Sequence, residues 1–309
     1  MSTRYSFLRK FILFTCVIVG SALVYFNFVY ATWTEDAKIL PSDGVASQGF
    51  GYSVDVSGDY AIVGVDNQKK AYIFHFEDGS WVQQAMFTTS TGSTLFAENV
   101  AIAGDYAMVT DHNDGSQAGA VFVYKRTGSS WDLHQRLVSS DLANQDFFGD
   151  KLAMAGEYAI IGAYREDQDA AGANTLSAAG SAYIFKRDGS GVWSQQQKIV
   201  PTDRAADDWF GRAVDISESG DYVLVGAPND DDTALSSGSA YVFYRTTSTW
   251  AQQAKLNAND PAASDFFGNA LSISDSGEYV VVGAYSNDDA GSASGSGYVF
   301  VRSGVSWSL

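Results

Sequence analysis

From Trp33 onward, the chain is a succession of short stretches in which apolar and polar residues alternate. In the first, Ser53-Val54-Asp55-Val56, every second side chain is apolar, as in a strand with one buried face. Gly58-Asp59 follows, and then the apolar stretch Tyr60-Ala61-Ile62-Val63-Gly64. A Gly-Asp pair between two such stretches predicts a β-hairpin, because glycine supplies the positive φ that tight hairpin turns require.

This pattern recurs, so that the chain contains five copies of one unit. The hairpin corner returns, always followed by tyrosine, as Gly104-Asp105, Gly156-Glu157, Gly220-Asp221 and Gly277-Glu278. A third alternating stretch follows in each copy: 71–74, 121–124, 182–185, 240–243 and 297–300. A tryptophan comes next in each copy, namely Trp81, Trp131, Trp193, Trp250 and Trp307. After the first four tryptophans a fourth stretch begins, so each unit is predicted to be four antiparallel strands.

Repeating four-stranded units of this length predict an all-β protein, a β-propeller with about 50 residues or slightly more in each blade. Residues 33–39 copy residues 250–256, which form the outermost strand of a blade. We therefore expect residues 33–40 to complete the blade formed by 266–306 and to close a ring of five blades. The alternative is that the chain is a piece of a larger ring. The repeats have no linker, which predicts a single domain over residues 32–309.

The first 31 residues differ from the rest. Arg4, Arg9 and Lys10 precede an apolar stretch, Phe11 to Tyr30, which we expect to form an apolar helix. Its length is sufficient to span a bilayer with the amino terminus in the cytoplasm. Val29-Tyr30-Ala31 also fits a signal-peptide cleavage site. Residues 1–31 are thus predicted to be a signal peptide or a signal anchor, and both place the repeats outside the cell, secreted or membrane-anchored.

Charge and composition exclude several functions. The formal charge is −17, which repels phosphate backbones and argues against a nucleic-acid partner. The only cysteine, Cys16, lies in the apolar segment, so the repeats have no thiol chemistry and no disulfide. The three histidines occur singly, without the spacing of a metal site. Catalysis therefore finds little support.

Phe210-Gly211 followed by Gly226-Ala227-Pro228 resembles the FG-GAP repeat of the integrin alpha-chain propeller. Gly162-Ala163-Tyr164 and Gly283-Ala284-Tyr285 match that motif in part. The resemblance implies a propeller fold and, loosely, adhesion or ligand binding. Integrin-like repeats carry a calcium loop between the two halves of the motif, whereas here a short hairpin fills that interval. The family's calcium residues are therefore not carried over, since so short a turn gathers too few oxygen ligands.

Acid-rich loops follow the second strand of most units. Their carboxylates are Glu166, Asp167, Asp169, Asp230, Asp231, Asp232, Asp288 and Asp289, with Asp111 and Asp114 in the second unit. The simplest interpretation is that these residues form turns and keep the surface soluble. The alternative is loose calcium binding, calcium being the only cofactor that the sequence suggests.

Another repeated motif is an aspartate, two aromatic residues and a glycine, at residues 146–149, 208–211 and 265–268. We interpret the aromatic side chains as core anchors between blades and the aspartates as turn-forming residues. An exposed aromatic platform is the alternative. The repeated tryptophans are interpreted as packing residues.

The sequence thus predicts an exported, non-catalytic binding or adhesion propeller that recognises a protein or glycan partner through loops on one face. A polysaccharide-active enzyme, a lyase or hydrolase with its site at the central channel, is the second hypothesis. Charged or aromatic side chains at the channel mouth would favour it. A structural module, or a fragment of a larger receptor, is the third. The membrane is a further partner through residues 11–30 if that segment is not cleaved.

Overall fold

The computed structural model describes residues 37–65, 68–89 and 95–309. The chain divides into two units, Met1–Lys38 and Ile39–Leu309. The expected apolar helix at 11–30, and the signal or anchor segment 1–31, lie outside the described residues. No helix among the described residues combines the length and apolar character needed to cross a bilayer.

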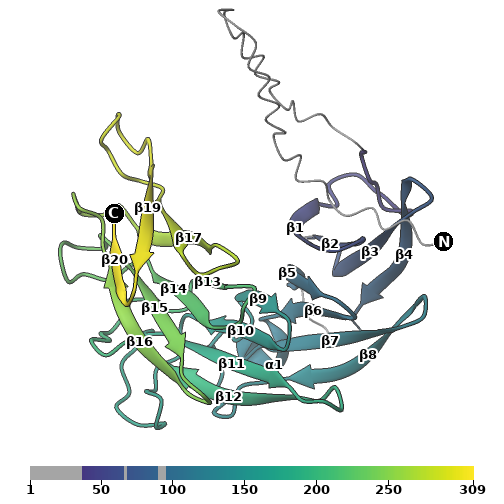
Figure 1. The fold of residues 1–309 in the computed structure, drawn as a ribbon, viewed down its shortest axis with the longest axis horizontal. Coiled ribbons are helices and arrows are strands. Elements are labelled where there is room, and N and C mark those ends of the chain that lie inside the picture. Colours follow the sequence, from purple (N-terminus) through teal and green to yellow (C-terminus); the bar gives the residue numbers. More distant parts are fainter. Residues whose placement is uncertain (1–36, 66–67, 90–94) are drawn as a thin grey trace, which may run out of the picture. The chain divides into compact units, whose positions relative to one another are not determined.

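Within Ile39–Leu309, the described residues form five four-stranded antiparallel sheets, here called blades 1 to 5, as the sequence predicts (Figure 1). Blade 1 consists of β1 (Phe50–Ser57), β2 (Tyr60–Val65), β3 (Lys70–Glu77) and β4 (Ser80–Thr88). Blade 2 consists of β5 (Phe96–Ala103), β6 (Tyr106–Asp111), β7 (Ala120–Thr127) and β8 (Ser130–Leu137), with the short α1 (Asp114–Gln117) before β7. Blade 3 consists of β9 (Lys151–Ala155), β10 (Tyr158–Ala163), β11 (Ser181–Arg187) and β12 (Trp193–Ile199). Blade 4 consists of β13 (Ala213–Ile216), β14 (Tyr222–Ala227), β15 (Ser239–Arg245) and β16 (Trp250–Leu256). Blade 5 consists of β17 (Phe267–Ile273), β18 (Tyr279–Ala284), β19 (Ser296–Ser303) and β20 (Ser306–Ser308).

Each blade is a meander in which neighbouring strands follow one another in the sequence. The first strands of successive blades contact one another in chain order, from β1 through β5, β9 and β13 to β17. The second strands of blades 2 to 4 are buried on both faces, which explains their nearly continuous apolar sequences, such as Tyr222–Ala227. This is the architecture of a β-propeller.

The second aromatic residue of each repeated motif anchors the core between blades, as predicted. Phe148, Phe210 and Phe267 are fully buried. Phe210 makes edge-to-face contacts with Tyr241 and Phe243 of its own blade, at centroid distances of 5.5 and 6.0 Å. It also packs in a cluster that contains Ile160 and Ala182 of blade 3 and Val223 of blade 4. The phenylalanine therefore joins two sheets.

The tryptophans are also packing residues, as predicted. Each of the last four contacts, edge-on, the tyrosine that begins the second strand of the preceding blade. The pairs are Trp131 with Tyr60, Trp193 with Tyr106, Trp250 with Tyr158 and Trp307 with Tyr222, at centroid distances of 5.9, 6.0, 6.0 and 6.5 Å. The indole N–H of Trp250 donates to Gln196 Oε1 of blade 3 at 3.3 Å, and that of Trp307 to Gln253 Oε1 of blade 4 at 2.9 Å. The indoles of Trp250 and Trp307 are thus hydrogen-bonded as well as packed, whereas the buried Nε1 of Trp193 has no hydrogen-bond partner.

Two glycines of the repeated motif, Gly226 and Gly211, each lie where the backbones of adjacent blades approach closely. A Cβ on Gly226 in β14 would lie 1.9 Å from the carbonyl oxygen of Gly268 in blade 5. Gly211 has a φ of +95°, and a Cβ there would lie 2.4 Å from Ser181 O of blade 3. The first glycine is required by the close approach of two backbones, and the second by both that approach and its φ.

The expected closing strand is not found. Ile39 and Leu40 belong to no strand, and Ile39 packs against Val63 and Tyr72 of blade 1 rather than against blade 5. The fourth strand of blade 5 is β20, which pairs with β19. Among the described residues, no backbone pairing joins blade 5 to blade 1. Residues 37–40 therefore do not close the ring by backbone hydrogen bonds, because similar sequence does not specify which sheet edge a strand meets. Residues 33–36 lie outside the described part.

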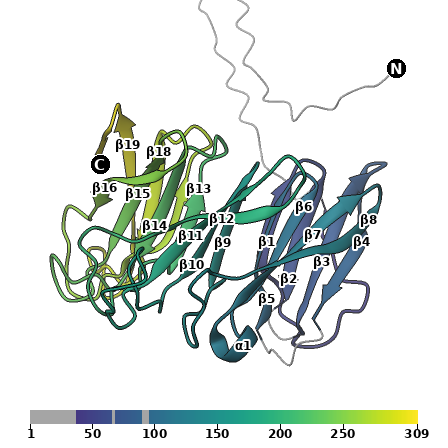
Figure 2. The ribbon, with the colours of Figure 1, turned by 90° about the horizontal axis from the view of Figure 1, so that it is seen from below.

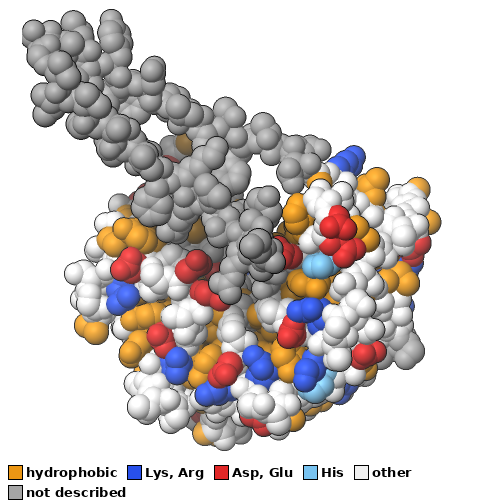
Figure 3. All heavy atoms as spheres, turned by 45° about the vertical axis from the view of Figure 1, so that its right-hand side comes forward, with side chains coloured by type: hydrophobic (Ala, Val, Ile, Leu, Met, Phe, Trp, Pro, Cys, Tyr) orange, Lys and Arg blue, Asp and Glu red, His pale blue; other side chains and the backbone are white. Residues whose placement is uncertain are grey.

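The negative charge is not concentrated on the face seen in Figure 3. There, acidic and basic side chains lie next to one another, with hydrophobic side chains between them.

Candidate functional site

The longest loops and the links between blades lie at one end of the sheets, which we call the loop face; α1 and these connections lie at the lower edge of Figure 2. The antiparallel meander requires this, since links after the second and fourth strands leave from the same end. Backbone hydrogen bonds join them. Trp209 N donates to Ala178 O at 3.2 Å, and Phe266 N donates to Ser236 O at 3.1 Å. Each loop of one blade thus supports the link into the next.

In blade 4, a lysine lies among the acidic residues of this face. Lys255 Nζ bonds Asp203 Oδ2 at 2.8 Å, Asp230 Oδ2 at 2.9 Å and Asp232 Oδ2 at 2.5 Å. Tyr241 also donates its hydroxyl to Asp230 Oδ2 at 2.6 Å. Despite a burial cost, hydrogen bonds with these carboxylates raise the pKa of Lys255. The ammonium group of Lys255 therefore neutralises part of the negative charge of these three carboxylates.

Blade 3 repeats this arrangement. Lys198 Nζ lies 2.6 Å from Asp141 Oδ2 and 3.1 Å from Glu166 Oε1. The Tyr183 hydroxyl donates to Asp141 Oδ1 at 2.9 Å. Asp146 lies beside them, and burial, followed by the charge of Glu166, raises the pKa of Asp146 to about 8. The cluster therefore has more carboxyl groups than its one lysine neutralises.

Blade 5 keeps the tyrosine and the acids of this cluster. Tyr298 donates its hydroxyl to Asp260 Oδ1 at 2.8 Å. A hydrogen bond with Asp260 raises the pKa of Asp289. Asn287 Nδ2 donates to Tyr298 Oη at 3.3 Å. None of the ion pairs among the described residues brings a lysine to Asp260 or Asp289, so this cluster differs from those of blades 3 and 4.

The other predicted calcium residues hold their own loops in shape. Asp167 Oδ1 accepts from Ala178 N at 2.7 Å, and Asp231 Oδ1 accepts from Ser236 N at 2.6 Å. Asp169 Oδ1 accepts from Ala171 N and Ala173 N, both at 2.9 Å, and Asp288 Oδ1 accepts from Ala293 N at 2.6 Å. In the second unit, Asp114 Oδ2 accepts from Arg136. The structure thus brings together Asp230 with Asp232, but it leaves Asp231 and Asp288 in turns.

Sequence reasoning missed the residues that complete these clusters. Asp141, Asp203 and Asp260 each follow an outer strand by a few residues. Asp43 follows the strand copy 33–39 in the same way, and its Oδ1 accepts from the Tyr72 hydroxyl of blade 1 at 2.6 Å. Lys198 and Lys255 hold equal positions, each being the next-to-last residue of its outer strand. The recurrence of these aspartates and lysines at equivalent positions in successive repeats was the sequence signal that could have identified the clusters. Across the parts of the chain that the structure describes, no group of three or more His, Cys, Asp or Glu side chains is arranged to hold a metal ion.

The first aromatic residues of the repeated motif behave differently from the buried second ones. Phe147, Trp209 and Phe266 are half-buried and have φ values near +60°. Tyr164 lies between two of them, with its centroid 5.5 Å from that of Phe147 and 5.5 Å from that of Trp209. In blade 5, Phe266 stacks on Tyr285 at 5.2 Å. The prediction of core anchors therefore holds for only one of the two aromatic positions.

We call Phe147, Tyr164 and Trp209 the aromatic line. Two arginines accompany it. The Arg165 guanidinium carbon lies 5.4 Å from the Phe147 centroid and 5.6 Å from that of Tyr164. Arg212 lies 5.5 Å from the Tyr164 centroid, and its Nη1 pairs with Asp150 Oδ2 at 2.9 Å. The line thus combines aromatic faces with guanidinium donors on one part of the loop face.

The turn-forming role of the aspartates in this motif is confirmed. Asp146, Asp208 and Asp265 each accept a hydrogen bond from the backbone N–H three residues earlier, at 2.8, 2.6 and 2.9 Å. These bonds hold the chain as it enters the positive-φ aromatic residue. The aromatic line is therefore positioned by backbone geometry.

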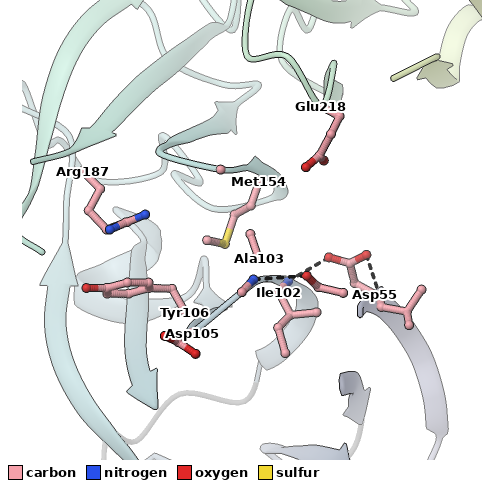
Figure 4. A pocket seen from close by; sticks show the side chains of 12 residues that line it. Asp55, Ile102, Ala103, Asp105, Tyr106, Met154, Arg187 and Glu218 are labelled. Carbon is pink, nitrogen blue, oxygen red and sulfur yellow. Dashed lines mark hydrogen bonds between the residues drawn. The ribbon is translucent and has the colours of Figure 1, made fainter. Parts of the chain in front are cut away.

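At the other end of the sheets, the first hairpins of blades 1 to 4 line a cavity of about 440 Å³. Figure 4 shows Asp55, Met154 and Glu218 around it, with Arg187 over the ring of Tyr106. This is the kind of charged and aromatic lining that a channel-mouth enzyme site requires. Whether this cavity could support catalysis depends on whether its carboxylate groups are free to act as an acid or a base.

The buried carboxylates at this end tie adjacent blades together. Asp55 Oδ1 accepts from Val56 N, and its Oδ2 accepts from Ile102 N of blade 2, both at 2.8 Å (Figure 4). Asp215 Oδ2 makes the same bond to Ile273 N of blade 5, at 2.8 Å. Burial raises the pKa of Asp55, and the charges of Asp215 and Glu218 add to that rise. Asp55 and Asp215 therefore have a structural role, since their hydrogen bonds join the first strands of adjacent blades.

Fold and motif together define a class of protein, a β-propeller of repeated antiparallel blades with loops gathered on one face. The profile of the FG-GAP repeat matches residues 33–74, 131–185, 193–243 and 250–300. This chain belongs to the FG-GAP repeat family. Repeats of this family form binding or adhesion-type propeller modules and are typically non-enzymatic. No curated protein matches the chain.

Proposed function

We propose that this chain is an exported, non-catalytic binding module that recognises a glycan partner at the cell surface through the loop face. The observation that carries the proposal is the aromatic line with its two arginines. Phe147, Tyr164 and Trp209 are half-buried, and their rings contact one another rather than the core between the blades. Aromatic and arginine side chains are enriched where proteins bind partners.

The chemical groups of a glycan are complementary to those of the aromatic line and its two arginines. A sugar ring presents an apolar face to an aromatic ring, and its hydroxyl or carboxylate groups accept hydrogen bonds from a guanidinium. Arg165 is exposed and lies over two rings of the line. A protein partner is the other outcome of the test described below.

Export is supported by the sequence of residues 1–31, with its basic flank and apolar stretch. We place the repeats outside the cell, either secreted or held at the membrane through residues 11–30. The acidic composition also argues against a nucleic-acid partner.

The cavity at the opposite end is a weaker basis for function. Its buried carboxylate, Asp55, accepts two backbone hydrogen bonds, so it is already used in joining blades. Glu218 is exposed and lies on a turn. A general acid and base pair at this cavity is therefore not the function that we favour.

The test is a glycan array with the full-length chain, the double variant Tyr164→Ala/Trp209→Ala, and a control. Tyr279→Ala is the matched control, since Tyr279 is exposed and lies in blade 5, outside the aromatic line. We expect the wild type and the control to bind the same glycans and the double variant to lose them. Binding that survives in the double variant would contradict the proposal. Binding to cell-surface proteins but to no glycan would assign the loop face to a protein partner instead.

A further inference from the structure

A lysine, two carboxyl groups and a tyrosine are enclosed together on the loop face of blade 3. Lys198 has only 4% of its side chain exposed, and Glu166 only 2%. Asp141, on the link from blade 2, has 18% of its side chain exposed. Tyr183 is fully buried, and the centroid of its ring lies 5.5 Å from Lys198 Nζ. Water is therefore largely excluded from the contact between the amine and the two carboxyl groups.

The contacts within this cluster have the arrangement that amide formation requires. Lys198 Nζ lies 2.6 Å from Asp141 Oδ2 and 3.1 Å from Glu166 Oε1. Asp141 Oδ1, the other oxygen of the same carboxyl group, accepts a hydrogen bond from the Tyr183 hydroxyl at 2.9 Å. Glu166 Oε1 also accepts from Gln168 N at 2.7 Å, which fixes its position. An amine, a carboxyl group, a proton acceptor and a hydrogen-bond donor are thus held together before any reaction.

We propose that Lys198 and Asp141 condense to an amide, an isopeptide cross-link within the folded chain. The ammonium group first passes one proton to Asp141 Oδ2 along their hydrogen bond, which leaves a neutral amine and a carboxylic acid. The nitrogen lone pair then attacks the carboxyl carbon, and Glu166 takes a second proton from the nitrogen. The Tyr183 hydroxyl stabilises the negative charge that develops on Oδ1. Glu166 finally gives its proton to Oδ2, the C–O bond breaks, and one water molecule leaves.

This condensation needs no oxidant, cofactor or second molecule. One C–N bond forms and one C–O bond breaks, and the two protons that the nitrogen loses leave with Oδ2 as water. Two buried charges of opposite sign become one neutral amide, so the cost of keeping an ion pair away from water disappears. The enclosure also slows the reverse reaction, because hydrolysis requires water at the same carbon.

The carboxyl groups that remain after the condensation do not require a lysine to neutralise them. Burial, followed by the charge of Glu166, raises the pKa of Asp146 to about 8. Asp146 therefore keeps its proton at neutral pH, and only Glu166 is charged.

Blade 4 has a lysine at the same position without the same enclosure. Lys255 has 18% of its side chain exposed, and Asp203, the counterpart of Asp141, has 35%. Asp230 stands in place of Glu166, and a third carboxylate, that of Asp232, also bonds Lys255. Lys255 therefore stays an ammonium group shared among three carboxylates, and we expect no cross-link there. The two blades provide an internal comparison within one chain.

The cross-link joins the link between blades 2 and 3 to the outer strand of blade 3, 57 residues further along the chain. The repeats contain no cysteine, so this bond takes the place of a disulfide in an exported chain. A covalent bond across so long a loop restricts the unfolded chain and stabilises the fold. It is independent of the glycan proposal, because it uses no residue of the aromatic line.

The test is tryptic peptide mapping of the full-length chain by mass spectrometry, with denaturation before digestion. Without the cross-link, residues 137–151, 188–198 and 199–204 appear as separate peptides. With it, residues 137–151 appear joined to residues 188–204, and the mass is lower than the sum of these two peptides by one water. Residues 188–204 stay uncut because trypsin does not cleave after an acylated lysine. We expect most of the wild-type chain to give the joined peptide.

Three variants identify the groups that react. Lys198→Arg removes the attacking amine but keeps the positive charge, and Glu166→Gln removes the proton acceptor but keeps the size of the side chain. Both should give only separate peptides and should melt at a lower temperature than the wild type. Lys255→Arg, in blade 4, is the matched control and should keep the joined peptide. Far-UV circular dichroism checks that each variant is folded.

Two results for the wild type overturn the proposal, and neither depends on the folding of a variant. One is an unmodified Lys198, with the three peptides separate. The other is a loss of water confined to residues 137–151, as in a cyclic imide of Asp141. A joined peptide that forms equally in Glu166→Gln overturns the assignment of Glu166 as the proton acceptor.

Discussion

Arg302 of blade 5 lies over the ring of Tyr222 of blade 4, with its guanidinium carbon 4.6 Å from the ring centroid. The same relation joins Arg126 to Tyr60, Arg187 to Tyr106 and Arg245 to Tyr158, at 4.5, 4.4 and 4.8 Å. Each of these tyrosines also meets a tryptophan of the following blade. A cation, an indole and a phenol thus form a repeated clamp between blades, and it is absent only where the described residues provide no following blade.

Tyr158→Leu tests this clamp. The substitution removes contacts with both Arg245 and Trp250, so we expect the free energy of unfolding to fall by about 2–3 kcal/mol. Tyr279→Leu changes the same position in blade 5, where the clamp is missing, and should cost less than about 0.5 kcal/mol. Urea denaturation at low protein concentration measures both. Equal losses in the two variants would show that the clamp contributes nothing.

Gly211→Ala tests the backbone contact between blades 3 and 4. Gly211 and Gly51 have φ values of +95° and +94°, but a Cβ at Gly51 meets nothing within 4 Å. Gly51→Ala therefore measures the cost of φ alone, about 1 kcal/mol. Gly211→Ala adds a clash with Ser181 O, and we expect a loss of about 3 kcal/mol or more. Thermal melting of the two variants separates the cost of the positive φ from the cost of the clash with Ser181 O. Similar melting temperatures for the two variants would show that the close contact at Gly211 does not affect stability.

Lys255→Met removes the ammonium group that neutralises Asp203, Asp230 and Asp232. Because those carboxylates then repel one another, we expect a loss of about 3 kcal/mol in the free energy of unfolding. Lys186→Met, at a lysine that lies over Tyr158, is the control and should cost less than about 1 kcal/mol. Calcium at millimolar concentration should raise the melting temperature of Lys255→Met more than that of the wild type. No difference between the two would show that the carboxylates do not act as a cation site.

The pH dependence of stability should include a contribution from Asp208. Burial, followed by the charges of Asp230 and Asp232, raises the pKa of Asp208 to about 7, despite its hydrogen bond from Ala205 N. Between the ordinary pKa of 3.8 and 7, the folded protein holds a proton that the unfolded chain has lost. Stability from this group therefore increases as the pH falls through 7.

Asp208→Asn should accordingly reduce the gain in melting temperature between about pH 8 and about pH 5.5. Asparagine keeps an oxygen for Ala205 N, so the turn is preserved. Asp207→Asn, at the exposed neighbouring residue, should retain the wild-type pH profile. If Asp208→Asn also retained it, Asp208 would not be the group that titrates.

Much of the fold could be read from local pattern. Alternation in Ser53–Val56 and the Gly58-Asp59 corner predict a hairpin, and β1 and β2 form it. Even blade 2, whose motif has drifted to Val109-Thr110-Asp111, keeps four strands because alternation and turn glycines persist. Half of the aromatic motif was also predicted correctly, since Phe210 is a core anchor. Trp209 was not, because adjacent residues with different φ values send their side chains to different environments.

The sequence by itself determined the repeating unit, its four strands and the residues that pack inside each sheet, because strand and turn propensities act over a few neighbouring residues. Tertiary structure alone decided which lysine neutralises which carboxylate and which aromatic residues reach the loop face. These features depend on the distance between blades about 50 residues apart in the chain. No local pattern encodes that distance, and so Ile39 was predicted at the last blade but packs against the first.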